Sequence, residues 1–153
     1  MKEIAGNLDA TGLKMALVVS RFNSFFTEQL VKGAADCFVR HGGKEADLTL
    51  VRVPGANELP QVAQRLAAAG QVDAVIALGA VIQGATPHAD LINGTVARAL
   101  AKIALDTGVP VLNGIVCALN LEQAIERAGT KQGNKGWDAT AAAIETVNVL
   151  KAL

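Results

Sequence analysis

The sequence predicts an α/β protein built around a parallel β-sheet. Apolar runs of strand length alternate along the chain with segments of ten or more residues whose apolar side chains recur at helical spacing. Strands that alternate with helices imply right-handed crossovers and parallel pairing. The main strand runs are apolar throughout, as strands covered by helices on both faces must be. These observations favour a flavodoxin-like three-layer α/β/α sandwich with a parallel central sheet.

The first third of the chain is expected to hold two strands and a helix. Ile4–Leu8 is a short candidate strand, a turn follows over residues 9–12, and Met15–Val19 is a compact apolar strand. Phe25–His41 is predicted to be a helix, which two successive glycines terminate. Its apolar side chains fall at helical spacing: Phe26, Leu30, Ala34 and Phe38.

The middle third continues the alternation. Leu48–Val53 has the pattern of a strand and stops at a Pro-Gly pair. Glu58–Ala69 is predicted to be helical, with a proline in its first turn and a glycine after its end. Ala74–Ile82 is the longest apolar run and is expected to be a buried strand.

The last third begins with a long predicted helix, Pro87–Thr107, followed by the strand Val111–Val116. Two shorter helices are expected at Leu121–Ala128 and Trp137–Leu150, joined by a glycine-rich connection over residues 129–136. The long helix directs one apolar stripe inward: Ile92, Val96, Leu100 and Ile103.

Composition and charge limit the class of protein. The chain has 153 residues, of which 51% are hydrophobic and 18% charged, and this suits one globular domain over residues 1–153. Fourteen Lys and Arg balance fourteen Asp and Glu, so no basic field indicates nucleic-acid binding and no cationic run indicates a membrane surface. A chain this apolar without net charge is expected to bury surface between its own copies, as a homo-oligomer.

The cysteines and the N-terminus indicate a cellular location. Cys37 and Cys117 lie in apolar patterns without metal-ligand spacing, and both are predicted to be reduced core residues. The N-terminal residues contain no apolar core of signal-peptide length, and no segment is long enough to span a membrane. We therefore expect a cytoplasmic protein without a bound metal.

The strongest candidate reaction centre follows the longest strand. Residues 84–88, Gly-Ala-Thr-Pro-His, supply an N-cap candidate (Thr86), a proline at the first helical position and then His88. Unpaired N–H groups at a helix start attract phosphate or carboxylate. The positive end of the helix dipole, which attracts such anions, disfavours the positively charged imidazolium. His88 is therefore expected to be neutral and able to accept a proton and pass it on. The alternative is an ordinary surface histidine.

Other candidate side chains each have a functional and an ordinary interpretation. Phe22 follows a strand and, if exposed, would stack on a flat ring. Glu58 either contacts a ligand or only enriches a first helical turn in negative charge, and Arg127 either binds an anion or only complements a helix dipole. Lys131 and Lys135 are ordinarily solvated loop charges. Neither a P-loop nor a GxGxxG motif occurs, so a nucleotide site is poorly supported.

Five motifs are spread over nearly the whole chain. They are Ser20-Arg21-Phe22-Asn23, residues 53–60 (VPGANELP), residues 73–79 (DAVIALG), residues 84–88 (GATPH) and residues 122–136 (EQAIERAGTKQGNKG). Together they resemble the motifs of the 6,7-dimethyl-8-ribityllumazine synthase family, and the motif over residues 122–136 is the most specific.

The resemblance implies a transferase of riboflavin biosynthesis. Such an enzyme condenses 5-amino-6-ribitylamino-uracil with 3,4-dihydroxy-2-butanone 4-phosphate, with no metal, nucleotide or redox cofactor. The amine attacks the ketone to give an imine, phosphate leaves, and the ring closes with loss of water. Carried onto matching positions, His88 shuttles protons. The uracil and ribityl chain are held by Phe22, Ala56, Glu58, Ala80, Val81 and Ile82, and the phosphate by Ala85, Thr86, Arg127 and Lys135.

The resemblance also implies an assembly. In the family the active site lies between neighbouring subunits of a pentamer, and members form pentamers, decamers or hollow sixty-subunit icosahedral shells. The 129–136 connection carries no insertion, which resembles the shell-forming members. Ile4–Leu8 would pair with a neighbouring subunit's sheet and cover its edge. We therefore expect pentamers and an icosahedral capsid.

The chain departs from the family pattern at the pocket. Asn57 and Asn113 stand where the family usually has aromatic residues, Gln83 replaces an arginine, and Ala89 replaces an aromatic residue. Each lost stacking contact costs on the order of 1 kcal/mol or more. Two hypotheses stay open: a working lumazine synthase with raised Michaelis constants, or a catalytically impaired scaffold whose role is self-assembly into a hollow shell. The same losses argue against a flavin-binding module.

Overall fold

The structure is a computed structural model that describes residues 1–84, 87–129 and 133–153. Its centre is a four-stranded sheet, parallel throughout, in the order β2-β1-β3-β4. The strands are β1 (Met15–Ser20), β2 (Leu48–Val53), β3 (Ala74–Ile82) and β4 (Val111–Ala118).

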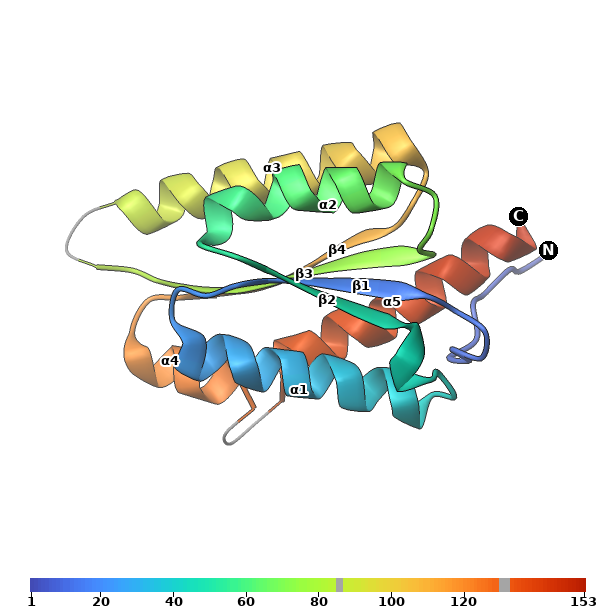
Figure 1. Cartoon of the computed structure of the whole chain (residues 1–153), viewed down its shortest axis with the longest axis horizontal. Helices are drawn as coiled ribbons and strands as arrows, with labels where there is room; N and C mark the ends of the chain where they lie inside the picture. The colour runs from blue at the N-terminus through green and yellow to red at the C-terminus, as the bar shows by residue number, and fades with distance from the viewer. Residues whose placement is uncertain (85–86, 130–132) are drawn as a thin grey trace.

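Helices cover both faces of the sheet. Figure 1 shows α2 (Leu59–Ala68) and α3 (His88–Thr107) on one face. The other face carries α1 (Ser24–Arg40), α4 (Leu121–Arg127) and α5 (Lys135–Ala152). The predicted three-layer flavodoxin-like sandwich is therefore confirmed.

Each face of the sheet has its own apolar core, because neighbouring side chains of a strand point to opposite faces. In β1, Leu17 belongs to the core under α1, α4 and α5, whereas Val18 belongs to the core under α2 and α3. Phe38 and Ile144 fill the first core, and Leu59 and Leu100 fill the second, all of them buried.

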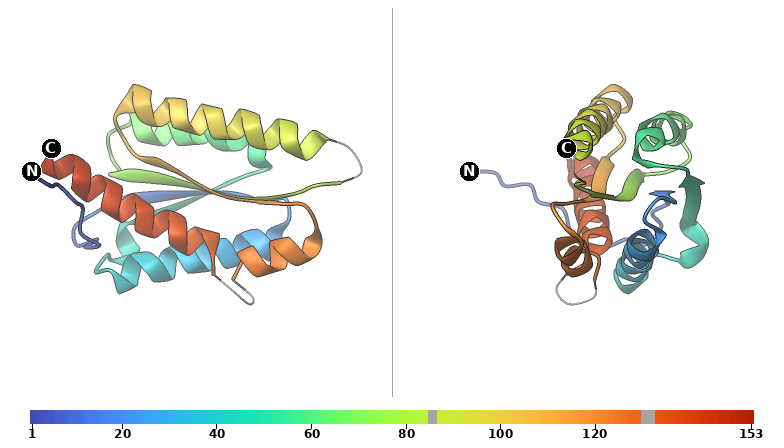
Figure 2. Two further views of the ribbon diagram at one scale, coloured as in Figure 1. Left: turned by 180° about the vertical axis from the view of Figure 1, so that it is seen from behind. Right: turned by 90° about the vertical axis from the view of Figure 1, so that its left-hand side faces the viewer.

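Parallel pairing brings the carboxyl ends of all four strands to one edge of the sheet. This edge faces the viewer in the right-hand view of Figure 2, and the loops that follow the four strands gather there. Both chain termini lie at the opposite end (Figure 1). Two 3₁₀ turns, Glu45–Asp47 and Ala56–Glu58, flank β2. No helix of the described residues is both long and apolar enough to cross a membrane.

The predicted strand at Ile4–Leu8 is wrong for the single chain: among the described residues, this segment has no strand pairing. The segment lies against α5 instead. Gly6 is so close that a Cβ there would stand 2.1 Å from the carbonyl oxygen of Glu145. The side-chain amide of Asn148 donates to the carbonyl oxygens of Asn7 and Asp9 at 2.9 and 3.0 Å. A strand needs a neighbouring strand to pair with, and a helix cannot serve because its backbone hydrogen bonds are made within the helix.

Two further predictions need correction. α3 begins at His88, with Pro87 at the N-cap position, so the predicted cap at Thr86 is one residue too early. Thr86 itself lies outside the described residues. Cys117 is exposed, not a core residue, because β4 is an edge strand and its α3-side positions are only partly covered. Cys37 is buried as predicted, and burial raises the pKa of its thiol to about 11.

Candidate active site

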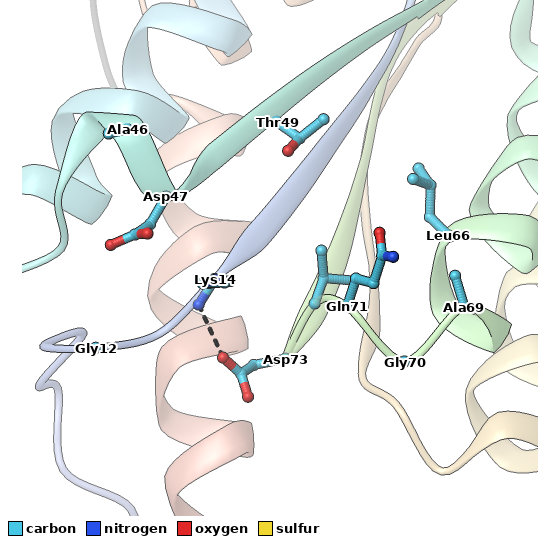
Figure 3. Close-up of a pocket in the computed structure, with 11 residues that line it drawn as sticks. Gly12, Lys14, Ala46, Asp47, Thr49, Leu66, Ala69, Gly70, Gln71 and Asp73 are labelled. Atoms are coloured by element: carbon cyan, nitrogen blue, oxygen red, sulfur yellow. Dashed lines mark hydrogen bonds between the residues drawn. The ribbon is translucent and has the colours of Figure 1, made fainter.

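Two large cavities lie at opposite ends of the sheet. One, of about 650 Å³, lies at the amino ends of the strands (Figure 3). Its polar walls include Lys14, whose backbone N–H donates to the Asp73 carboxylate at 2.8 Å, and Asp47. Of the predicted site residues that the structure describes, none lines this cavity. Ligands of parallel sheets bind at the carboxyl ends, so the second cavity is the candidate active site.

The second cavity, of about 570 Å³, lies at the carboxyl ends of β1, β2 and β3 and against the start of α3. We call it the carboxyl-end pocket. It brings together all six of the predicted uracil and ribityl residues with His88. Its sequence-predicted lining residues are Phe22, Ala56, Asn57, Glu58, Ala80, Val81, Ile82 and His88.

Phe22 supplies an exposed aromatic ring at the rim of the pocket. The residue lies two positions after the end of β1, and 73% of its surface is exposed. Its backbone N–H donates to the carbonyl oxygen of Pro54 at 3.2 Å, and the N–H of Arg21 donates to Val53 at 2.8 Å. The loops after β1 and β2 are therefore tied together, and the ring is free to stack on a flat ligand.

Glu58 closes the turn that follows β2. Its carboxylate accepts a hydrogen bond from the backbone N–H of Gly55 at 3.0 Å, and its own N–H donates to the carbonyl oxygen of Gly55 at 3.3 Å. The turn is a short 3₁₀ segment that carries Ala56 and the exposed Asn57 before α2 begins. One oxygen of Glu58 thus shapes the turn, and the other stays available to polar groups in the pocket.

The third wall combines the end of β3 with the start of α3. Ala80 is buried, whereas Val81 and Ile82 are half-buried and face the cavity. His88 is exposed at the first position of α3 and lines the same cavity. Ala85 and Thr86, the predicted phosphate ligands between them, lie outside the described residues.

Three predicted residues do not line the pocket of their own chain: Asn113, Arg127 and Lys135. Arg127 and Lys135 end α4 and begin α5, so they lie on the sheet face opposite α3. The guanidinium of Arg127 donates to the carbonyl oxygen of Cys117 at 3.0 Å. Although Cys117 is exposed, partial desolvation by the surrounding protein raises the pKa of its thiol, and the nearby charges of Lys135 and Arg127 oppose that rise.

Asn113 lies exposed on β4, well before the carboxyl end of the strand. Its side-chain oxygen accepts the N–H of Ile115, two residues on, at 3.0 Å. The chain therefore presents two groups of candidate residues that do not meet within it. One group lines the carboxyl-end pocket, and the other consists of the exposed Asn113 and Arg127 and the half-buried Lys135.

Sequence reasoning missed several lining residues. Ser20 is the buried last residue of β1, Asn23 lies at the N-cap of α1, and Ile92 comes from the second turn of α3. The signal for Ser20 and Asn23 was their place at a strand end, where a parallel sheet binds ligands. Ile92 carries no such signal, because an apolar residue on a helix stripe is ordinarily core. Within the described residues, no three His, Cys, Asp or Glu side chains gather as a metal site would require.

Comparisons with known proteins identify relatives over nearly the full length. The model of a family described as 6,7-dimethyl-8-ribityllumazine synthase matches residues 12–151. A protein of that name from Prosthecochloris aestuarii is 56% identical over 97% of this chain and 96% of its own length. Another, from Nitratidesulfovibrio vulgaris, is 54% identical over 100% of this chain and 98% of its own. A third, from Chlorobium limicola, is 53% identical over 99% of this chain and 97% of its own length.

Proposed function

The chain belongs to the 6,7-dimethyl-8-ribityllumazine synthase family, and from that premise we propose how its residues divide the work of the reaction. The reaction is the riboflavin-pathway condensation of 5-amino-6-ribitylamino-uracil with 3,4-dihydroxy-2-butanone 4-phosphate. The primary amine attacks the ketone and water leaves as the imine forms. Phosphate is then eliminated, and closure of the second ring releases another water.

The carboxyl-end pocket holds the uracil substrate. Phe22 stacks on the pyrimidine, the Ala56–Glu58 turn contacts the ribityl chain, and Ala80–Ile82 forms the floor under the ring. The support for this assignment is that all of these residues line one cavity of about 570 Å³, a volume suited to a ligand of this size.

His88 moves the protons. Imine formation needs a proton removed from the attacking amine and one given to the departing hydroxyl, and phosphate elimination needs a proton taken from carbon. A single imidazole at the pocket wall can perform these transfers in turn. The support is its place at the start of α3, lining the same cavity as Phe22 and Glu58.

The phosphate is held by Arg127 and Lys135 of a second copy, together with Ala85 and Thr86. Both cations lie away from the pocket of their own chain, on the opposite face of the sheet. A ring of copies joins one face of each subunit to a different face of the next, so a ring would deliver these cations to the neighbour's pocket. We propose a pentamer for that ring, sixty subunits for the complete icosahedral shell, and Asn113 as a further contribution of the neighbour.

The observation that carries the function is the joint lining of one cavity by Phe22, Glu58 and His88 in a chain of this family. Its test is turnover: the purified protein is mixed with both substrates, and the fluorescent lumazine product is followed. We expect product well above the uncatalysed rate. If product formed only at the uncatalysed rate with saturating substrates, the assembly scaffold would be the better hypothesis. The relatives that match over nearly their full length are all named as enzymes, and this speaks against the scaffold.

A mixing experiment tests the shared site. His88→Ala and Arg127→Ala subunits are unfolded, mixed in equal amounts and refolded together. If the two halves of each site come from different copies, about a quarter of the sites in the mixture hold neither substitution. Activity near a quarter of the parent's supports the proposal. A mixture that gives only the average of the two separate variants contradicts it.

We also propose that the protein works in the cytoplasm. Both cysteines are free, which fits a reducing compartment. Localisation of a tagged chain by fractionation checks this.

A further inference from the structure

Asn23 has a backbone conformation that side chains rarely adopt. Its φ of 60° and ψ of 46° place it in the left-handed region, and it is the one non-glycine residue with a positive φ among residues 1–84, 87–129 and 133–153. Asparagine tolerates this region better than most residues, yet the conformation still carries a cost. Such conformations persist where surrounding contacts require them, and they gather at functional sites.

The side chain of Asn23 is used for an unusual contact. Asn23 occupies the N-cap position of α1, where asparagine ordinarily accepts hydrogen bonds from the first helical N–H groups. Here its side chain makes no such bond. Its amide nitrogen instead donates to the carbonyl oxygen of Ala80, 57 residues later, at 2.8 Å. The start of α1 is thereby tied to the end of β3, the strand that forms the floor of the carboxyl-end pocket.

The neighbouring Phe22 needs such an anchor. With 73% of its surface exposed, its ring is not held by packing, so its position depends on the backbone on either side. On one side, the N–H of Phe22 donates to Pro54, in the loop after β2. On the other side stands Asn23, whose carbonyl oxygen accepts the N–H groups of Phe26 and Thr27 while its side chain reaches Ala80.

We propose that Asn23 is a positioning residue for the uracil substrate. Its hydrogen bond to Ala80 sets the separation between the Phe22 ring and the pocket floor, so that a pyrimidine ring fits between them. The left-handed backbone is what directs the Asn23 side chain across to β3. This inference rests on the proposed function, because it names the substrate held in the pocket.

The experiment compares Asn23→Gly with Asn23→Asp. Glycine adopts the left-handed backbone without strain and loses only the side chain, whereas aspartate keeps the shape and loses the donor. Both should raise KM for the uracil substrate about tenfold, the effect of one lost hydrogen bond, and leave KM for the butanone phosphate within about twofold. A parent-like KM in Asn23→Gly would overturn the proposal, since only the backbone would then matter.

A double-mutant cycle with Phe22→Ala separates positioning from a general loss of structure. If Asn23 acts through Phe22, Asn23→Gly should have little further effect on KM once the ring is gone. Fully additive effects would contradict the proposal. Asn148→Asp is the matched control, because it removes an amide donor far from the pocket. It should lower the melting temperature without changing KM.

Failure of the proposed function is recognised separately. If the parent protein shows no turnover, the same variants are compared by titration with the fluorescent product 6,7-dimethyl-8-ribityllumazine. The positioning role is supported, without catalysis, if both Asn23 variants bind the product with a tenfold higher Kd than the parent. In the Phe22→Ala background, the same Asn23 substitutions should then leave Kd unchanged. Equal Kd values in the parent and the variants reject it.

Discussion

The side-chain amide of Asn134 donates a hydrogen bond to the carbonyl oxygen of Gln29 at 2.9 Å, although 105 residues separate the two. The oxygen of the same side chain accepts the N–H groups of Gly136 and Trp137 and so caps α5. The helices meet closely: a Cβ on Gly33 would lie 2.3 Å from Asn134 Cγ. This junction fixes the start of α5 on α1 and, with it, the position of Lys135.

Replacing Asn134 with alanine should therefore destabilise the fold. The change removes a helix cap worth about 1 kcal/mol and the side-chain hydrogen bond that links the start of α5 to Gln29 in α1, for a total loss of about 2 kcal/mol. Urea unfolding at fixed protein concentration measures it. Asn120→Ala is the control, because Asn120 caps α4 through a single bond to the N–H of Gln123. Equal losses in the two variants would show that the bond to Gln29 contributes nothing.

His88→Ala should lower kcat with little change in either KM. A positioned proton-transfer group contributes about 10²- to 10⁴-fold to rate, so a fall in this range is expected. The other histidine of the chain serves as the control. His41 follows α1, and its Nδ1 lies 2.6 Å from the carbonyl oxygen of Cys37, far from the pocket lining. His41→Ala should keep the parent kcat. An unchanged kcat in His88→Ala would remove the proton-transfer role.

Arg127→Ala should raise KM for the butanone phosphate more than KM for the uracil substrate. A charge-assisted hydrogen bond to phosphate is worth about 1.5–3 kcal/mol, or roughly 10- to 100-fold in affinity. Arg127→Lys should recover only part of this, because lysine lacks the planar fork of donors. Arg65→Ala, at an exposed position of α2, is the control for a lost surface cation. Equal rises in both KM values would count against a phosphate role.

Asn57→Phe should strengthen binding of the uracil substrate. Asn57 is exposed and lines the carboxyl-end pocket, so a ring there would cover apolar surface and stack on the pyrimidine. Stacking and burial worth about 1–1.5 kcal/mol would lower KM about tenfold. Asn57→Leu adds apolar area without a ring and should recover less. If leucine matches phenylalanine, burial alone explains the gain and stacking does not.

Much of this molecule follows from its sequence, and the failures have physical causes. The apolar runs at Met15–Val19 and Ala74–Ile82 are confirmed as strands, because nothing but a sheet covered on both faces suits them. Ile4–Leu8 does not form a strand within the single chain, because a strand needs a neighbouring strand to pair with. Its pairing with a neighbouring subunit stays a prediction. The contact between Asn23 and Ala80 was equally out of reach, since it joins residues far apart in the chain through a rare backbone conformation.

The ion pair between Glu28 of α1 and Arg52 of β2 makes a small, pH-dependent contribution to stability. Nη1 of Arg52 donates to Oε1 of Glu28, and Nη2 of Arg52 donates to Oε2 of Glu28 at 3.2 Å. The hydrogen bond from Arg52 holds the pKa of the Glu28 carboxyl below its usual 4.5. A carboxyl whose pKa is lowered by folding stabilises the fold above its unfolded pKa, and this is lost as pH falls through the lowered pKa.

Both side chains of this pair are more than a third exposed, so solvent screening limits the effect to about 0.5 kcal/mol at neutral pH. Glu28→Gln should thus melt slightly below the parent at pH 7, and the two should converge as pH falls from the usual 4.5 through the lowered pKa of Glu28. Thermal unfolding at equal protein concentration from pH 7 to pH 3 measures this. The exposed pair Asp36–Arg40 on α1 provides the control, through Asp36→Asn. A difference between Glu28→Gln and the parent that stayed constant across this range would mean that the substitution acts through packing and not through the ion pair.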